Sequence, residues 1–264
     1  MALVSPQKSL LSLSRVSYSV AAVQLLDNIS FDVRRGEILA IIGPNGAGKT
    51  SLLKVLGGEL TPSQGDIFMA NTALADWPLL ARARSLAVLP QFSDLRFPFR
   101  VDEVVALGRI PHQTGVKIDN DIVDAAMAAM DIAYLKGRNY MALSGGEKQR
   151  TQLARVMAQI WREQDAHERV LLLDEPTMAL DLGHQQQLMA AISAFAKQGI
   201  AVVMVMHDLN LAAQYADTLL ALGCGRLVAY GAVNDVLTEE LVRDLFQARV
   251  HVLIHPSSQK RVMV

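Results

Sequence analysis

The chain of 264 residues has one cysteine, Cys224, and almost no net charge (formally −1). A lone thiol cannot form an internal disulfide, which excludes a disulfide-stapled secreted fold and favours a reducing compartment. A near-neutral balance also gives no global basic field of the kind that attracts nucleic acid or an anionic membrane. We therefore expect no nucleic-acid partner.

Long hydrophobic runs and targeting signals are also missing. The most apolar stretch, residues 199–207, is too short to cross a bilayer and has the length of a buried strand. Residues 1–19 lack the basic start, the apolar core and the small-residue cleavage site of a signal peptide. We therefore expect the protein to stay in the cytosol.

What the sequence does contain is a set of short, continuous apolar runs. Three of them, within residues 37–50, 169–177 and 200–208, each end in a charged or glycine-rich loop. Runs of Val, Ile and Leu without polar alternation are typical of parallel strands buried on both faces. Helical spacing follows at 51–57 and 184–197. The pattern predicts an open α/β sheet whose functional residues lie at the carboxyl ends of the strands.

Two other regions differ from this α/β core. Residues 10–20 alternate and residues 25–37 have the pattern of a strand, a bend and a turn, which indicates an antiparallel sheet against the core. Residues 101–110 and 119–135 have helical spacing, and we interpret residues 92–160 as a helical subdomain inserted into the core. The predicted division of residues 1–264 is a single domain with a core of 1–91 and 161–264.

The first candidate site is the segment GPNGAGKT (43–50), which has the form G-x-x-x-x-G-K-[ST] between a predicted strand and a predicted helix. Its glycines let the backbone wrap a phosphate chain at the positive end of a helix. Lys49 is expected to reach the β- and γ-phosphates, and the Thr50 hydroxyl to bind Mg²⁺. The predicted nucleotide-binding residues here are Gly43, Pro44, Asn45, Gly46, Ala47, Gly48, Lys49, Thr50 and Ser51.

The segment VLLLDEP (170–176) supplies matching carboxylates. Asp174 ends an apolar strand, which fits the residue that holds Mg²⁺ beside a P-loop. Glu175 follows it and is well placed to polarise the water that attacks the γ-phosphate. Together with the P-loop, these two residues predict nucleotide hydrolysis.

A further segment of small residues, LSGGE (143–147), lies between these two motifs. The Ser144 side chain is expected to cap a helix that begins near Glu147, while Gly145 and Gly146 admit an oxygen close to the backbone. Taken alone, this segment is typical of an ordinary helix N-cap. The combination of GPNGAGKT, LSGGE, LLLDEPT and a later His-Asp pair is similar to the ATP-binding subunit of ABC transporters over nearly the whole chain.

The resemblance implies an ABC ATPase fold: a RecA-like P-loop core, an antiparallel β subdomain and a helical subdomain. It implies ATP and Mg²⁺ as cofactors and a head-to-tail homodimer, in which LSGGE closes on the ATP in the P-loop of the partner. Gln91 matches a glutamine that senses Mg²⁺ and the γ-phosphate, Asp181 matches an aspartate that crosses the dimer interface, and His207 matches the histidine that contacts the γ-phosphate.

The sequence departs from the family pattern in two places. Members usually place an aromatic residue before the first core strand to stack on adenine, and here Val20 occupies that position. Tyr18, two residues earlier and so on the same face of a strand, is the candidate replacement. Met178 stands where a serine is usual, which is expected to change contacts at the dimer interface and to leave hydrolysis in place.

The flanking segments resemble one subgroup of the family. Residues 207–217 are similar to ATPases that import ferric siderophores, cobalamin and haem, and the segments 97–112, 161–169 and 179–189 are most like haem (hemin) importers. The implied partners are a polytopic permease dimer in a bacterial inner membrane and, indirectly, a periplasmic substrate-binding protein. The chain is then peripheral at the cytoplasmic face. The expected permease groove includes Phe92, Leu95, Phe97 and Phe99.

Other functions remain as alternatives. Ferric siderophore or cobalamin import would use the same motifs, and an exporter subunit would share the ATPase parts. DNA-repair ATPases with LSGGE-like loops carry a long coiled-coil insertion and a basic surface, and the segment between Thr50 and Asp174 has no sustained heptads. Translation-factor ATPases place two cassettes in one chain, whereas this sequence has one.

Overall fold

A computed structural model describes residues 9–21, 23–91, 95, 97–256 and 260–264. Its internal contacts divide the chain into two units, each described by itself below. Unit 1 comprises Met1–Asp76 and Ala201–Val264, and unit 2 comprises Trp77–Ile200. The division expected from the sequence, with a helical subdomain at 92–160, has different boundaries and stays a prediction.

The antiparallel sheet of unit 1 has the strand order β2-β1-β4-β5. Its strands are β1 (Ser9–Val20), β2 (Val23–Arg34), β4 (Gln64–Met69) and β5 (Thr72–Ala73). Alternation along β2 buries every second side chain from Ile29 to Val33, which gives the sheet one apolar face. The predicted strand over 10–20 and the antiparallel sheet are therefore confirmed, and β2 runs further than the bend and turn expected within 25–37.

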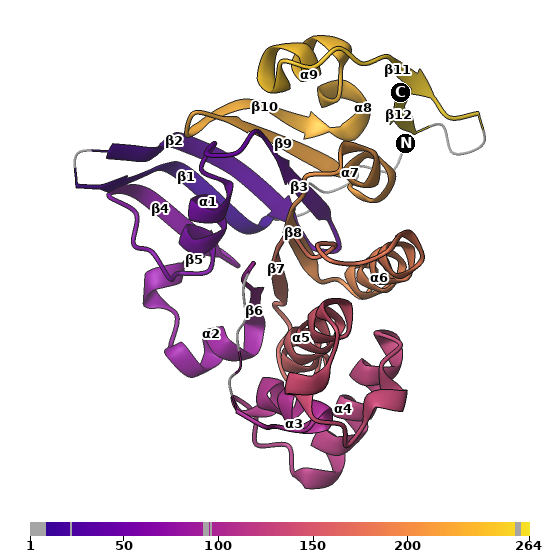
Figure 1. Cartoon of the computed structure of the whole chain (residues 1–264). Coiled ribbons are helices and arrows are strands. Elements are labelled where there is room, and N and C mark those ends of the chain that lie inside the picture. The colour runs from indigo at the N-terminus through magenta and orange to yellow at the C-terminus, as the bar shows by residue number, and fades with distance from the viewer. Residues whose placement is uncertain (1–8, 22, 92–94, 96, 257–259) are drawn as a thin grey trace, which may run out of the picture. The chain divides into compact units, whose positions relative to one another are not determined.

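A second sheet of unit 1 has the order β10-β9-β3-β8, in which β9, β3 and β8 are parallel and β10 is antiparallel (Figure 1), while β11 and β12 form a separate antiparallel pair. Both β3 and β8 are buried along their whole length, as their entirely apolar composition of Val, Ile, Leu, Ala and Met requires. The bounds are β3 (Ile38–Ile42), β8 (Ala201–Val205), β9 (Thr218–Gly223), β10 (Arg226–Ala232), β11 (Val252–Ile254), β12 (Arg261–Met263), α1 (Lys49–Leu56), α7 (Leu209–Tyr215), α8 (Val233–Val236) and α9 (Glu239–Phe246).

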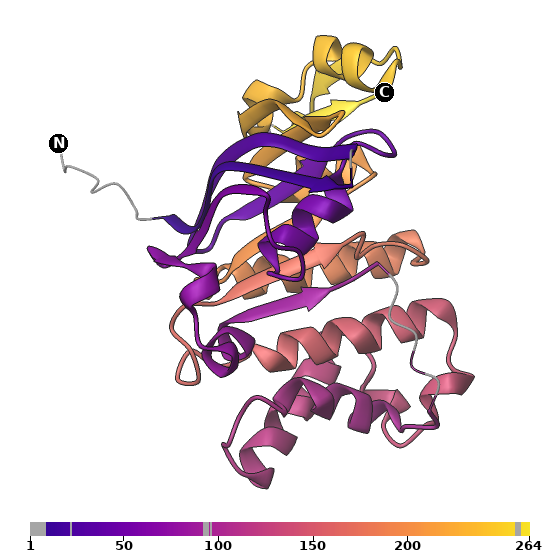
Figure 2. The same ribbon diagram turned by 90° about the vertical axis from the view of Figure 1, so that its left-hand side faces the viewer.

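Unit 2 contains a parallel strand pair and five α-helices among its described residues. Helix α5 packs on both α3 and α4, and its apolar side chains are buried against them (Figure 2). Its elements are α2 (Leu79–Ser85), β6 (Leu86–Leu89), α3 (Val101–Ala106), α4 (Val116–Ala129), α5 (Gly145–Gln159), β7 (Val170–Asp174) and α6 (Leu182–Ala196). The helices expected near 101–110, 119–135 and 184–197 are present with shifted ends.

A buried ionic cluster joins two distant segments of unit 2. The guanidinium of Arg109 has a side-chain exposure of 3% and donates to Asp165 at 2.8 Å and to Asp119 at 2.9 Å. It also donates to the Ala158 carbonyl and to the Thr114 hydroxyl. Because Asp165 belongs to the 161–169 stretch and Arg109 to the 97–112 stretch, two of the three segments that resemble haem importers meet here.

His112 extends the same cluster. Burial lowers the pKa of its imidazole, so the ring is neutral at pH 7. Its Nε2–H donates to the Gln159 carbonyl at 2.7 Å, because a carbonyl can only accept. The Gln159 amide in turn donates to the Ala83 and Leu86 carbonyls at the junction of α2 and β6. The cluster therefore fastens the ends of α3 and α5 to β6.

We expect Arg109→Met to destabilise unit 2 by about 3 kcal/mol, because it removes the nearer cation from the buried carboxylate of Asp165 and leaves only Arg162, whose Nε lies 3.9 Å away. Both tryptophans, Trp77 and Trp161, lie in unit 2, so urea unfolding followed by tryptophan fluorescence measures the loss. The matched control is Arg100→Met, whose ion pairs are exposed and whose expected cost is below about 0.5 kcal/mol. Equal shifts for both variants would contradict a stabilising role of the buried cluster.

Candidate functional site

The loop 43–50 of unit 1 leaves β3 at its carboxyl end and leads directly into α1. Gly43 has φ +155°, and a Cβ at this position would lie 2.2 Å from the Leu222 carbonyl oxygen. Gly48 has φ +99°, and a Cβ there would lie 2.7 Å from the Leu25 carbonyl oxygen. The loop therefore approaches the backbones of β9 and β2 so closely that only glycine fits at these two positions.

Lys49 turns back over this loop. Its side chain is buried, and its Nζ donates to the Gly43 carbonyl at 2.8 Å and to the Pro44 carbonyl at 2.9 Å. These charge-assisted hydrogen bonds hold the Lys49 ammonium against the first two residues of the loop. The loop therefore has a fixed positive charge beside its backbone.

The start of α1 suits an anion. Gly48 is the N-cap residue and no side chain caps the helix, so the positive end of the helix dipole is not covered by a capping oxygen. At Gly46, with φ +79°, a Cβ would meet nothing within 4 Å, which leaves open space beside the loop. A glycine loop, an uncapped helix start and a lysine form a cradle that fits a phosphate chain.

His207 belongs to the same edge of the unit 1 sheet. It follows β8, where the Met206 amide donates to the Ile41 carbonyl of β3 at 3.0 Å. Gly43 follows β3 two residues after Ile41. Because the two parallel strands end side by side, the structure brings His207 and the 43–50 loop to one edge, as predicted from the strand ends. His207 is exposed.

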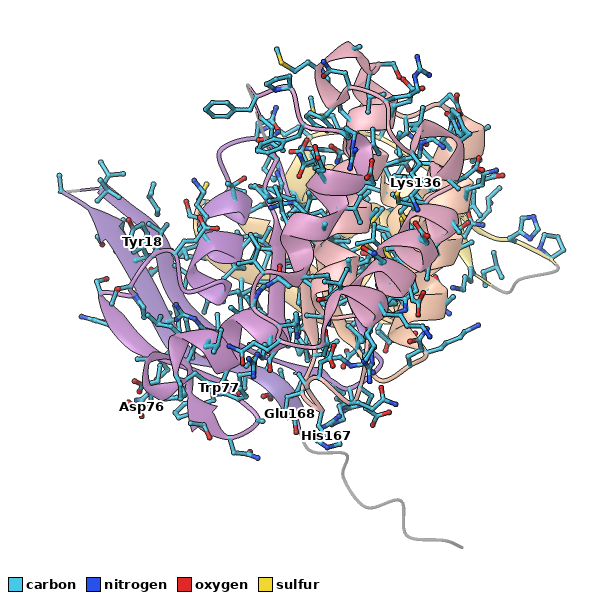
Figure 3. All side chains as sticks on the ribbon, turned by 90° about the horizontal axis from the view of Figure 1, so that it is seen from below. Tyr18, Asp76, Trp77, Lys136, His167 and Glu168 are labelled. Atoms are coloured by element: carbon cyan, nitrogen blue, oxygen red, sulfur yellow. The ribbon has the colours of Figure 1, made fainter. Side chains whose placement is uncertain are left out.

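Tyr18 is a half-buried residue of β1 (Figure 3). Across the antiparallel pair its register partner is Leu26, whose side chain would lie 3.2 Å from a Cβ built on Gly48. Paired residues on neighbouring antiparallel strands project to one face. This links Tyr18 to the beginning of α1, whereas Val20 is half exposed and pairs with Val23 at the end of the hairpin.

In unit 2, Asp174 ends strand β7 and is 2% exposed. The following residue, Glu175, has φ +51°, a left-handed conformation that is uncommon for a residue with a side chain. Such a conformation persists only where surrounding contacts impose it, and it is enriched at functional sites. The chain thus turns sharply at Glu175, directly after the last residue of β7.

The segment Ser144–Glu147 forms a complete capping box. The Glu147 amide donates to the Ser144 hydroxyl at 3.3 Å, and the Ser144 amide donates to the Glu147 carboxylate at 2.8 Å. The latter bond lowers the pKa of the Glu147 carboxyl below its usual value. The predicted cap is present, and the helix begins at Gly145, two residues earlier than expected.

The loop after β7 packs against this helix start. A Cβ on Gly146 would lie 3.2 Å from the Ala179 carbonyl oxygen, and the Gln149 amide donates to the Pro176 carbonyl at 3.2 Å. Asp181 ends the loop and caps α6 through the His184 amide at 2.9 Å, which lowers the pKa of its carboxyl. Unit 2 therefore brings the LSGGE segment and the loop containing Asp181 together. The absence of a side chain at Gly146 permits this contact.

Gln91 lies at the same strand edge as the acidic residues of unit 2. It is half-buried and follows β6 by two residues, and β6 pairs in parallel with β7, with Leu89 opposite Leu173. Among the described residues, no group of three or more His, Cys, Asp and Glu side chains could hold a metal ion. Mg²⁺ commonly binds one or two protein oxygens together with substrate phosphates, so the Thr50 hydroxyl and Asp174 carboxylate remain chemically suitable ligands.

Comparison with known proteins decides the family. The model of the ABC transporter family matches residues 26–178, which include the P-loop, Gln91, the LSGGE segment and both acidic residues. The chain belongs to the ABC transporter family.

Related ABC proteins cover nearly all of the chain. A hemin import ATP-binding protein from Gloeobacter violaceus is 50% identical over 94% of this chain and 90% of its own. One from Pseudomonas fluorescens is 52% identical over 88% of this chain and 90% of its own. A solved structure assigned to the metal-chelate type of ABC transporter, in an inward-facing conformation, is 28% identical, with a TM-score of 0.80 over 97% of this chain and 96% of that one.

Family membership confirms the ABC ATPase fold predicted from the sequence motifs. This ABC subunit binds ATP and hydrolyses it to drive transport, and such cassettes work as dimers with transmembrane permease partners. Among the residues that the structure describes, no helix has both the length and the apolar character needed to cross a bilayer.

The close approach at Gly43 gives a testable prediction. We expect Gly43→Ala to weaken ATP binding at least about tenfold, because the new methyl group displaces the loop from the Leu222 carbonyl. The control is Gly137→Ala, at a position that also has a positive φ, of +80°, but where a Cβ would meet no atom within 4 Å. Titration with a fluorescent ATP analogue measures both. Unchanged affinity in Gly43→Ala would show that the loop tolerates the displacement.

Proposed function

We propose that this subunit powers haem (hemin) import by ATP-driven closure and reopening of its homodimer. The observation that carries the proposal is the identity of about half the residues, over 94% of the chain, with a hemin import ATP-binding protein. The joining of the 97–112 and 161–169 segments through Arg109 and Asp165 supports it, because these are two of the three segments that are most like haem importers.

ATP binding is assigned to the 43–51 loop and Lys49. The loop amides and the start of α1 surround the phosphates, and the Lys49 ammonium is already fixed at the loop. Thr50, Asp174 and Gln91 are the proposed ligands of Mg²⁺, which when bound neutralises phosphate charge. Tyr18 is the proposed adenine contact, supported by its pairing with Leu26 next to Gly48.

Hydrolysis is assigned to Glu175, with His207 and Gln91 as further catalytic residues. The Glu175 carboxylate orients the attacking water and accepts its proton. His207 donates a hydrogen bond to the γ-phosphate, which is supported by its position at the same strand edge as the P-loop. Gln91 contacts Mg²⁺ and the γ-phosphate, and its position therefore depends on whether ATP is bound.

The second copy of the chain completes the site. Ser144, Gly145, Gly146 and Glu147 are the proposed contacts to the ATP of the partner, with Asp181 at the interface. Ser144 and Gly145 are exposed, and the Asp181 side chain is 70% exposed beside the exposed side chains of Met178 and Leu182. Exposed apolar groups around a polar centre are typical of a surface that another protein covers.

The proposed membrane partner is a polytopic permease dimer in a bacterial inner membrane, with this chain at its cytoplasmic face and a periplasmic binding protein supplying cargo. The predicted groove residue Phe97 is 67% exposed and stacks edge-on against the half-buried Phe99. Leu95 is half-buried, and Phe92 lies outside the described residues.

Cargo is tested by reconstituting the chain with the permease encoded beside it. We expect haem delivered by the binding protein to stimulate ATP hydrolysis, whereas ferric siderophore and cobalamin leave the rate at its basal value. The steady-state ATPase rate is titrated against each cargo. Stimulation by siderophore or cobalamin alone would replace haem and leave the transport ATPase assignment in place.

We expect Glu175→Gln to lower kcat for ATP hydrolysis at least about a hundredfold, because the amide cannot accept the proton of water. ATP affinity is expected to stay within about twofold, and the ATP-bound variant to accumulate as a dimer measurable by light scattering. Lys49→Ala serves as the contrasting variant, since it loses ATP binding and so cannot dimerise with ATP. A Glu175→Gln protein that turns over normally would refute the role of Glu175.

A further inference from the structure

Helix α7 begins two residues after His207 and has only seven residues. A helix of this length is marginal by itself, so its position depends on what holds it. Its inner face is held by the buried Leu211, Ala212 and Ala213. Its outer side lies beside the β11–β12 hairpin (Figure 1), more than forty residues further along the chain.

The hairpin is joined to α7 by a reciprocal pair of hydrogen bonds. The Asn210 amide nitrogen Nδ2 donates to the Met263 carbonyl at 3.1 Å, and the Met263 backbone N–H donates to Asn210 Oδ1 at 2.8 Å. A carboxamide has both a donor and an acceptor, so it pairs with a peptide group as a neighbouring strand would. Lys260 adds a bond to the Gln214 carbonyl at the other end of the helix.

The backbone of Met263 faces α7 because of its register in the hairpin. His251 and Val264 exchange both of their backbone hydrogen bonds, at 2.9 Å and 3.0 Å. Residues in an antiparallel pair alternate between bonded and non-bonded positions, so the next pair, Val252 and Met263, is non-bonded. The N–H and C=O of Met263 thus point away from β11 and toward Asn210.

The hairpin is in turn fixed to the rest of unit 1. The Val252 amide donates to the Glu239 carboxylate at 3.0 Å, and the Arg261 guanidinium donates to the Leu237 carbonyl. The hairpin therefore bridges the α8–α9 region and α7. Through it, α7 is restrained on its outer side as well as on its buried face.

This restraint acts next to His207. The preceding residue, Met206, is held by its bond to Ile41, and the following residue, Asp208, caps α7 by accepting from the amides of Asn210 and Leu211. The backbone direction of His207 is therefore set by the first turn of α7. Asn210 lies in that turn, and its side chain connects it to β12.

We propose that Asn210 is a positioning residue for ATP hydrolysis, which holds the first turn of α7 against β12 and thereby fixes the orientation of His207. The inference rests on the γ-phosphate contact assigned to His207 under Proposed function. The β11–β12 hairpin then contributes to the rate of ATP hydrolysis. It does not contribute to ATP affinity, because it makes none of the P-loop contacts described above.

The test uses three substitutions in the full-length chain. Asn210→Ala removes both bonds, and Met263→Pro removes the N–H donor without breaking a β11–β12 bond. Met263→Ala is the control, because it changes the side chain and keeps the backbone pair. We expect the first two to lower kcat for ATP about five- to tenfold with KM within about twofold, and Met263→Ala to match the wild type.

Two further readouts separate positioning from a general loss of stability. Hydrogen exchange of the amides in the 206–216 segment is expected to accelerate about tenfold in Asn210→Ala, while exchange in β3 stays unchanged. Asn210→Asp keeps the acceptor for the Met263 N–H and is expected to recover part of kcat. In the Asn210→Ala/Met263→Pro double variant, the two losses are expected not to add, since they break one shared contact.

Comparison with His207→Ala separates the positioning role of Asn210 from the role assigned to His207. If His207→Ala loses turnover and Asn210→Ala keeps the wild-type kcat, the positioning role is wrong and the assignment of His207 stands. If His207→Ala itself keeps the wild-type kcat, the assignment of His207 is wrong and the positioning role falls with it. A rise in KM of the same size as the fall in kcat would show that the hairpin supports nucleotide binding instead.

Discussion

The parallel pairing of β3 with β8 is the constraint on which the geometry of unit 1 depends. The bond from the Met206 amide to the Ile41 carbonyl makes the two strands end together, so the P-loop and His207 begin at one edge of the sheet. Continuous apolar side chains bury both strands completely, so the strands lie in the core of unit 1. The buried strands thus determine where the P-loop and His207 begin.

The polar groups of unit 2 are positioned differently, because they lie on loops and at helix ends and are held by hydrogen bonds between these segments. The capping box at Ser144, the Gln149 bond to the loop after β7 and the Asp181 cap of α6 link three segments into one surface. The Arg109 cluster fastens the far end of α5 to β6. Helix α5 is therefore held at both of its ends.

The sequence predicted the P-loop, the acidic corner and the LSGGE cap because each depends on residues within a few positions of one another. It predicted helix ends less well. Helix α4 was expected to extend to residue 135 and ends at Ala129, since Asp131 adopts φ +52°. Helix α3 stops at Ala106, next to Gly108, where a Cβ would lie 2.1 Å from the Arg155 carbonyl oxygen. Such tertiary contacts are not visible in local spacing, and neither is the pairing of Asn210 with Met263.

The capping box at Ser144 has a consequence for how this position tolerates change. Toward the helix its hydroxyl acts as an acceptor, from the Glu147 amide, and a hydroxyl that accepts still has a hydrogen to donate. Aspartate caps helices as well as serine does, yet its carboxylate has no hydrogen for an oxygen on the outer side and repels an anion. Helix capping and the proposed contact with the ATP of the partner thus impose separate demands on one side chain, and serine satisfies both.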